Sequence, residues 1–330
     1  MSDISKRIDE AREKLNKKYG KMTSRNLKKD KAVVDVISTG SMKLDIATGV
    51  GGFPLGSIVE VFGGESSGKT TLCISTISQA QKSGKICAYI DSEHAFDKNY
   101  AEKLGVDLES LIFVQPDSLE DALNITVDLI GVADFICFDS VAAAVPEKEL
   151  NGEIGDHTIG IKARLMSQAM RMIVSKARSE KCLILFVNQI REKIGVMFGS
   201  NITTPGGLAI KFAAAMRIQL RSSAKNKEDK KDTSRITSND IVAKVIKNKL
   251  APPHTTATYA ISYFDGIYGV NLIGEVVDLA LDCGILKKSG SWFSLDGSNI
   301  GQGKNGAVRF FQDNDECYQD ILLKLKKDFF

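Results

Sequence analysis

The stretch that most constrains how this chain folds is Gly63-Gly64-Glu65-Ser66-Ser67-Gly68-Lys69-Thr70. An apolar run, 58–62, precedes it, and residues 71–77 follow with the pattern of a helix. A strand, a glycine-rich turn and a helix, in that order, form the phosphate-binding P-loop. Glycines let consecutive backbone N–H groups turn toward an anion, and the helix N-terminus adds its own unpaired N–H groups. The stretch therefore predicts a site for a nucleoside triphosphate.

Two side chains of this stretch have expected roles in phosphate and metal binding. Lys69 would reach the β- and γ-phosphates, and the Thr70 hydroxyl would hold Mg²⁺. Further along, Asp139 ends an apolar strand. A carboxylate there is expected to hold Mg²⁺, or its water shell, opposite Thr70. The alternative is an aspartate that starts a loop or caps a helix.

Polar residues also end two other predicted strands. Asp91 and Glu93 follow one of them, and either carboxylate is placed to orient or deprotonate the water that attacks the γ-phosphate. The spacing does not choose between the two. Asn188 and Gln189 close the other strand, where a neutral amide could bind the γ-phosphate and report its presence.

The central part of the chain alternates between apolar runs and helical segments. The expected strands are 58–62, 86–91, 111–114, 135–139 and 183–187. The expected helices among them are 71–77, 97–104, 120–130 and 163–178. Near-continuous apolar strands separated by helices predict a doubly wound, mostly parallel α/β sheet covered on both faces. Ligands of such a sheet bind beyond the carboxyl ends of its strands, where the polar residues above lie.

The two ends of the chain differ from this centre, and we expect three parts: 1–37, 38–268 and 269–330. The first holds an amphipathic helix and a linker, and the helix packs either on its own core or on a neighbouring subunit. Toward the end of the second part, alternating residues predict antiparallel strands at 216–220, 241–246 and 256–261. The charged stretch 224–240 is expected to be an exposed loop. The third part reads as a small α/β domain.

Composition restricts the class of protein. The chain has 43% hydrophobic and 26% charged residues, as soluble globular proteins do, and it has no apolar run of membrane-spanning length. We expect no membrane partner and no export, because the N-terminus lacks an apolar signal region. Six scattered cysteines indicate reduced thiols in the cytoplasm. The net charge is only +3, so any binding of nucleic acid has to use local basic patches.

A long segment, 190–207, has four glycines and no helical or strand period. It presents Met197 and Phe198 beside the cations Arg191 and Lys193. Apolar side chains flanked by cations suit stacking on nucleic-acid bases or wedging between them. The alternative is a loop that packs onto the core.

Two lysines, Lys247 and Lys249, end one of the alternating strands. They could form a solvated edge that opposes aggregation. They could also supply positive charge to the γ-phosphate of a neighbouring subunit, as arginine fingers do.

Several longer stretches, taken together, resemble the RecA family of bacterial recombinases along nearly the whole chain. Beyond the P-loop, they are Ile90-Asp91-Ser92-Glu93-His94-Ala95, Gly152-Glu153-Ile154-Gly155-Asp156, Met166-Ser167-Gln168-Ala169-Met170-Arg171, Asn188-Gln189-Ile190-Arg191, Lys193-Ile194-Gly195-Val196-Met197-Phe198-Gly199 and Lys247-Asn248-Lys249. The P-loop is shared with many ATPases, whereas the run 193–199 together with 188–191 is specific.

The resemblance implies a RecA-like P-loop ATPase core and a DNA-dependent ATPase that uses ATP and Mg²⁺. It implies a helical homo-filament on single-stranded DNA that pairs and exchanges strands with double-stranded DNA in recombinational repair. It also implies that the filament promotes self-cleavage of a repressor in the DNA-damage (SOS) response. Two other classes compete with this reading: a ring-forming P-loop DNA motor, and a DNA-binding scaffold whose nucleotide only regulates assembly.

The resemblance also implies roles for individual residues of the nucleotide site. Glu93 corresponds to the water-activating residue and Gln189 to the γ-phosphate sensor. Lys247 and Lys249 would act on a neighbour's ATP. The implied nucleotide contacts are Gly63, Gly64, Glu65, Ser66, Ser67, Gly68, Lys69, Thr70, Thr71, Asp97, Tyr100 and Tyr263.

For DNA, the resemblance implies two binding loops, 152–160 and 190–207, with further contacts outside them. The implied DNA-binding residues are Arg164, Arg171, Arg191, Lys193, Met197, Phe198, Gly206, Gly207, Arg221, Lys244, Lys288 and Lys304. Of these, Arg221 and Lys244 would belong to a secondary site, and Lys288 and Lys304 to a basic face of the C-terminal domain. The N-terminal helix would dock on the next subunit, with Phe212 near that interface.

Overall fold

The fold is known from a computed structural model, which describes residues 3–20, 24, 34–153, 160–192, 202–227, 236–263 and 267–330. It divides into two compact units, Met1–Asp35 and Val36–Phe330, which are described separately. In the first unit, helix α1 (Asp3–Tyr19) confirms the predicted helix. Asp3 lies in its first turn and Lys17 and Lys18 in its last, where their charges complement the helix dipole.

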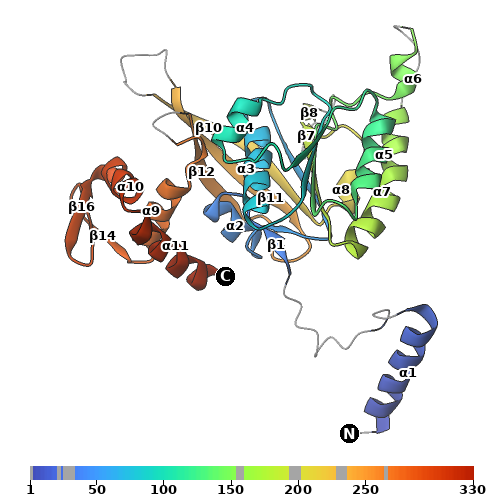
Figure 1. The fold of residues 1–330 in the computed structure, drawn as a ribbon, viewed down its shortest axis with the longest axis horizontal. Coiled ribbons are helices and arrows are strands. Elements are labelled where there is room, and N and C mark those ends of the chain that lie inside the picture. Colours follow the sequence, from blue (N-terminus) through green and yellow to red (C-terminus); the bar gives the residue numbers. More distant parts are fainter. Residues whose placement is uncertain are drawn as a thin grey trace. The chain divides into compact units, whose positions relative to one another are not determined.

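The second unit is built on a nine-stranded mixed sheet of order β13-β12-β11-β10-β3-β7-β6-β4-β5 (Figure 1). The five predicted central strands are confirmed, and they run parallel: β3 (Ile58–Gly63), β4 (Cys87–Asp91), β5 (Leu111–Val114), β6 (Phe135–Asp139) and β7 (Leu183–Gln189). The other strands are β10 (Met216–Lys227), parallel to β3, then the antiparallel β11 (Ile236–Asn248), β12 (Thr256–Ser262) and β13 (Gly269–Val270).

Helices cover both faces of this sheet, as the apolar strands predict (Figure 1). On one face, α3 (Lys69–Lys82) packs Leu72 and Ile77 into a core that includes Val61 of β3. On the other face, α5 (Leu119–Leu129) and α7 (Ile161–Ser179) pack against Phe138 and Phe186. The remaining helices of this part are α2 (Met42–Thr48), α4 (Lys98–Lys103), α6 (Glu147–Leu150) and α8 (Ala209–Ala213).

The prediction of an exposed loop over 224–240 is wrong at both ends. Strand β10 continues to Lys227 and β11 begins at Ile236, and the two pair in an antiparallel ribbon. The backbone makes the hydrogen bonds of such a ribbon, so a polar segment can pair without an apolar face. Two short antiparallel pairs complete this part: β1 (Val36–Ile37) with β2 (Phe53–Pro54), and β8 (Arg191–Glu192) with β9 (Ile202–Thr203).

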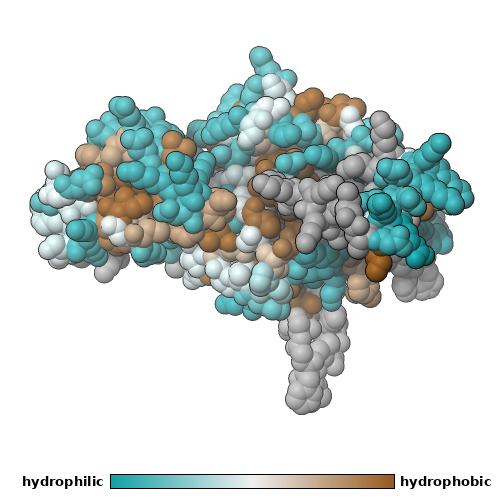
Figure 2. All heavy atoms as spheres, turned by 90° about the horizontal axis from the view of Figure 1, so that it is seen from below, coloured by the Kyte–Doolittle hydropathy of each residue, from teal (hydrophilic) through white to brown (hydrophobic). Residues whose placement is uncertain are grey.

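The last part of the chain has its own core of buried side chains, among them Val277, Phe293, Phe311 and Leu325. It consists of α9 (Leu272–Asp282), an antiparallel sheet of β14 (Leu286–Ser289), β15 (Trp292–Leu295) and β16 (Ser298–Gln302), and helices α10 (Gly303–Asp313) and α11 (Asp315–Phe329). On the face seen in Figure 2, the coloured residues are mostly hydrophilic, with apolar patches between them. Among the described residues, no helix has the length and apolar character needed to cross a membrane.

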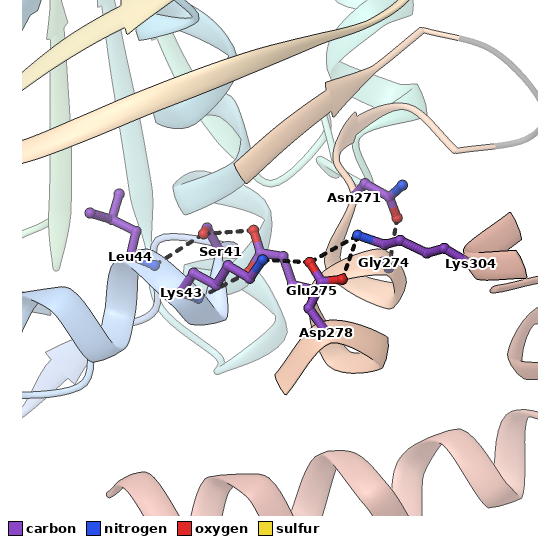
Figure 3. A network of polar contacts seen from close by, with 8 residues as sticks. All are labelled: Ser41, Lys43, Leu44, Asn271, Gly274, Glu275, Asp278 and Lys304. Carbon is purple, nitrogen blue, oxygen red and sulfur yellow. Dashed lines mark hydrogen bonds and ion pairs between the residues drawn. The ribbon is translucent and has the colours of Figure 1, made fainter. Parts of the chain in front are cut away.

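A polar network joins α9 to the central part (Figure 3). The buried Glu275 carboxylate accepts hydrogen bonds from the Ser41 hydroxyl (2.8 Å) and the Lys43 backbone N–H (3.0 Å). Beside it, Asp278 forms ion pairs with Lys43 and Lys304. Because burial outweighs these hydrogen bonds, the pKa of Glu275 rises to about 7.

This network predicts opposite pH effects for two neighbouring carboxyl groups. Glu275 has a folded-state pKa above its ordinary value, so its ionisation costs stability as pH rises from about 4.5 to about 7. Glu275→Gln should remove that loss, which is up to roughly 3 kcal/mol. Burial alone would raise the pKa of Asp278, but hydrogen bonds from Lys304 and Lys43 hold it below its usual value.

Asp278→Asn should therefore destabilise the protein at pH 7 and have little effect at pH 3. Urea unfolding of both variants across this pH range is the measurement. If Glu275→Gln lost stability at pH 8 relative to pH 4.5, in parallel with the unmodified protein, burial would not control this group.

Candidate active site

The P-loop forms a closed turn between β3 and α3. Gly68 has φ +84°, in the left-handed region that favours glycine, and a Cβ on Gly63 would lie 2.4 Å from the Leu220 carbonyl oxygen. The Lys69 ammonium donates hydrogen bonds to the carbonyls of Gly64 (2.7 Å) and Gly63 (3.3 Å). Burial lowers the pKa of Lys69, and the nearby carboxylates of Asp139 and Glu93 oppose that shift. The lysine therefore lies over the turn that would hold the phosphates.

Thr70 and Asp139 lie together, as a shared metal site requires. The Thr70 hydroxyl, in the first turn of α3, donates to Asp139 Oδ2 at the end of β6 over 2.8 Å. Burial raises the pKa of Asp139 to about 6, so a cation at this place would stabilise its ionised form. Oxygen ligands of this kind are those that Mg²⁺ prefers, and the two residues therefore fit the ion.

The structure separates the two carboxylates that the spacing left open. Asp91 is buried, and its oxygens accept hydrogen bonds from the backbone N–H groups of Glu93, Ala95 and Phe96 and from the side chain of Gln115. These hydrogen bonds to Asp91 stabilise the turn that follows β4. Glu93 is exposed, and its Oε1 accepts from the Ser140 hydroxyl and from Gln189 Nε2 (3.4 Å). Glu93 is therefore the carboxylate available to a water molecule.

The two amides at the end of β7 also differ in role, one being structural and one facing the site. Asn188 is buried and donates to the Glu60 carboxylate (3.1 Å) and the Pro205 carbonyl (3.0 Å). Glu60 is also ion-paired with the buried Arg217. Asn188 thus holds strands and loop together, and Gln189 is the amide that faces Glu93.

Among the other implied nucleotide contacts, Tyr100 lies next to α3. The Tyr100 hydroxyl is 3.1 Å from the Thr71 hydroxyl. Burial raises the pKa of Tyr100, and Tyr263 is close enough to contribute to that shift. Asp97 has an evident structural task, because its carboxylate caps α4 by accepting from the N–H groups of Asn99 and Tyr100.

Lys247 and Lys249 lie far from the P-loop of their own chain. Lys247 Nζ donates to the carbonyls of Lys211 (2.7 Å) and Phe212 (3.1 Å), and Lys249 Nζ reaches the Phe212 carbonyl, so both bind the end of α8. Burial, then the neighbouring Lys249, lowers the pKa of Lys247 to about 8.

The P-loop is beside the other end of the same strand, where Asn239 donates to the Ser66 carbonyl (3.4 Å). Eight residues of β11 lead from Asn239 to Lys247, a length of about 27 Å.

Several predicted DNA contacts lie on α7 and on the loop that ends at Gly207, and some of their side chains are exposed. Arg164 and Arg171, two helical turns apart on α7, and Arg191 on β8 are exposed. Gly206 and Gly207 have positive φ, and a Cβ on Gly207 would lie 3.0 Å from the Ala163 side chain, so the loop end packs closely on α7. Lys193, Met197, Phe198 and residues 154–159 lie outside the described residues.

The residues predicted for other DNA sites form two further groups. Exposed Arg221 and Lys244 share one face of the β10–β11 pair, since Lys244 lies opposite Gln219 in the register. Lys288 is exposed and lies over the Phe293 ring at 5.6 Å. Lys304 is bound to Asp278, which partly neutralises its charge.

Two residues that contact the site were not singled out from the sequence. Ser140 binds Glu93, and its position directly after Asp139 was the available signal. Tyr89 donates a hydrogen bond to Asp139, but it lies inside an apolar strand and nothing in its neighbourhood indicates that contact.

The P-loop, the carboxylate at the end of β6 and the Glu93–Gln189 pair on a mixed sheet define a P-loop ATPase of the RecA fold. A family model for the RecA N-terminal domain matches residues 6–268, and one for the RecA C-terminal domain matches residues 274–329. The chain belongs to the RecA family. RecA-family proteins are DNA-dependent ATPases that act in recombination and repair, and the chain is a member of that class.

Individual relatives agree with this assignment. Protein RecA of Cytophaga hutchinsonii is 50% identical over 319 residues, which cover 96% of this chain and 88% of that protein. Protein RecA of Agrobacterium fabrum is 46% identical over 330 residues, with 99% and 89% covered. The crystal structure of the RadB recombinase shares the fold, with a TM-score of 0.53, 21% identity, and coverage of 69% of this chain and 96% of that one.

Proposed function

We propose that this chain binds ATP and Mg²⁺, assembles as a helical filament on single-stranded DNA, and exchanges strands with a homologous duplex. The observation that carries the proposal is the meeting of Thr70, Asp139, Glu93 and Gln189 beside one P-loop. These residues come from three neighbouring strands and from α3, so only the folded sheet brings them together.

Each residue has a distinct part in the proposed hydrolysis. Lys69 and the P-loop N–H groups bind the phosphates, and Mg²⁺, held by Thr70 and Asp139, would neutralise phosphate charge when bound. Glu93 orients and deprotonates the attacking water. Thr71, Asp97, Tyr100 and Tyr263 form the side on which the base lies.

Gln189 is placed to connect the nucleotide with DNA. It ends β7, and β8 begins two residues later at Arg191, paired with Thr203 of β9. The segment 193–201 starts and ends at this ribbon. A γ-phosphate that draws Gln189 away from Glu93 would therefore shift the base of a DNA-binding loop. We assign DNA contact to 152–160 and 190–207, with Arg164 and Arg171 beside them.

The proposed active site is completed by a neighbouring subunit. Ile241, whose side chain lies beside Gly68 of the P-loop, is six residues from Lys247 along β11, and a lysine side chain cannot span that length of about 20 Å. The two lysines are therefore proposed to act on the next subunit's ATP. Phe212, which is 68% exposed beside them, supports a subunit contact at this place.

The remaining proposals concern the domains and the cell. Residues 1–37 would dock on the neighbouring subunit, 38–268 would form the ATPase core, and 269–330 would form a C-terminal domain. Lys288 and Lys304 would guide duplex DNA there, and Arg221 and Lys244 would form a secondary DNA site. We further propose that the protein works in the cytoplasm and that the filament promotes self-cleavage of a damage-response repressor.

Hydrolysis measured with and without single-stranded DNA tests this proposal. We expect ATP hydrolysis to depend strongly on the DNA, because assembly supplies Lys247 and Lys249. Electron microscopy of the same samples should show helical filaments with ATP. Closed rings would favour a ring-forming motor, and hydrolysis indifferent to DNA together with nucleotide-dependent assembly would favour a regulated scaffold.

A further inference from the structure

The Asp139 carboxylate has a second donor besides Thr70. Tyr89, on the neighbouring strand β4, is 1% exposed, and its hydroxyl lies 2.8 Å from Asp139 Oδ2. The Thr70 hydroxyl donates to the same oxygen over an equal 2.8 Å. A tyrosine hydroxyl keeps its proton at neutral pH, so Tyr89 is the donor in this contact.

Packing explains the ring of Tyr89 but not its hydroxyl. The ring centroid lies 4.8 Å from that of Phe96 and 6.3 Å from that of Phe113, contacts that a phenylalanine would make equally well. Tyr259 shows that this core accepts a buried phenol whose hydroxyl has no hydrogen-bond partner within the described part of the chain. The hydroxyl of Tyr89 instead points at a carboxylate of the proposed metal site.

Two hydrogen-bond donors on one oxygen restrict the rotation of the Asp139 carboxylate. The terminal torsion of an aspartate is broad, so a single hydrogen bond leaves the group freedom to rotate. With Tyr89 and Thr70 both bound to Oδ2, Asp139 stays in the orientation that accepts the Thr70 proton. The lone pairs of the Thr70 oxygen then remain free to bind a cation.

We propose that Tyr89 is a positioning residue, which holds Asp139 so that Thr70 and Asp139 bind Mg²⁺ together with the nucleotide. This inference rests on the proposed metal role of those two residues. Partners behind metal ligands of this kind commonly change metal affinity by about 10- to 100-fold when removed.

The test measures how much Mg²⁺ tightens nucleotide binding, without any turnover. The affinity for a fluorescent ADP analogue is measured in saturating Mg²⁺ and in EDTA, for the unmodified protein and for Tyr89→Phe. We expect Tyr89→Phe to bind the nucleotide normally in EDTA. The factor by which Mg²⁺ increases the nucleotide affinity should be about tenfold smaller in this variant than in the unmodified protein. Manganese titration of the ADP complex should show the same weakening.

Tyr259→Phe is the matched control, because it removes an equally buried hydroxyl that has no partner in the described ranges. It should leave the Mg²⁺ gain unchanged. A full Mg²⁺ gain in Tyr89→Phe, or equal losses with Mg²⁺ and with EDTA, would overturn the role of Tyr89. If the unmodified protein itself showed no gain from Mg²⁺, the proposed metal site would fail instead.

Discussion

Replacing Lys69 by alanine should abolish ATP hydrolysis and strand exchange while leaving the fold intact. The ammonium is the charge nearest the phosphate turn, and removing one such electrostatic contact commonly costs about 10²- to 10³-fold in rate or more. In this structure, Lys69 binds two carbonyls of the P-loop itself, so its loss leaves the core packing unchanged. Steady-state hydrolysis with single-stranded DNA is the measurement, with thermal unfolding as the check on folding.

Lys82→Ala is a matched control for this variant. Lys82 is in the last turn of the same helix, α3, at the end remote from the P-loop. The Lys82→Ala variant should hydrolyse ATP at the normal rate. Strand exchange by Lys69→Ala at the rate of the unmodified protein would show that the nucleotide site has been assigned wrongly.

Removing the charges of Lys247 and Lys249 should have a comparable effect by a different route. Both lysines donate hydrogen bonds to the end of α8, so glutamine is the better replacement, because it keeps a donor without the charge. Cations supplied by a neighbour are worth about 10³- to 10⁵-fold in related phosphoryl transfers. The double variant Lys247→Gln, Lys249→Gln should therefore lose DNA-dependent hydrolysis.

Nucleotide binding separates this variant from Lys69→Ala. Its own P-loop is intact and lies about 20 Å away along β11, so the isolated subunit should bind ATP normally. Weakened ATP binding by the dispersed double variant would mean that the lysines act within their own subunit.

Much of the central fold could be predicted because its signals are local. The strands from Ile58 to Gln189 are apolar runs, and the P-loop is contiguous in sequence. The polar extensions of β10 and β11, within the stretch predicted to be a loop, could not be predicted, because backbone hydrogen bonds pair them and leave no apolar period. Short segments such as β8 and β9 exist only through pairing with each other.

The strand ends that meet at the site could be predicted, but not which of two candidate side chains at a strand end faces the nucleotide. Asp91 and Glu93 are equivalent by spacing. Only the hydrogen bonds from backbone N–H groups of the following turn show that the Asp91 carboxylate has a structural role. The same is true of Asn188, whose partner Glu60 is 128 positions away. The folded geometry of a turn decided the first case and a contact between distant strands decided the second, and spacing along the chain contains neither.

The central claim is that each ATP is hydrolysed by a site shared between two subunits. Mixing Lys69→Ala with the double variant Lys247→Gln, Lys249→Gln on single-stranded DNA tests it most directly. Each variant alone should be inactive. In an equimolar mixture, about a quarter of the head-to-tail interfaces combine an intact P-loop with an intact lysine pair, and about that fraction of normal hydrolysis should return. A mixture as inactive as its components, although both variants enter the same filaments, would contradict the shared site.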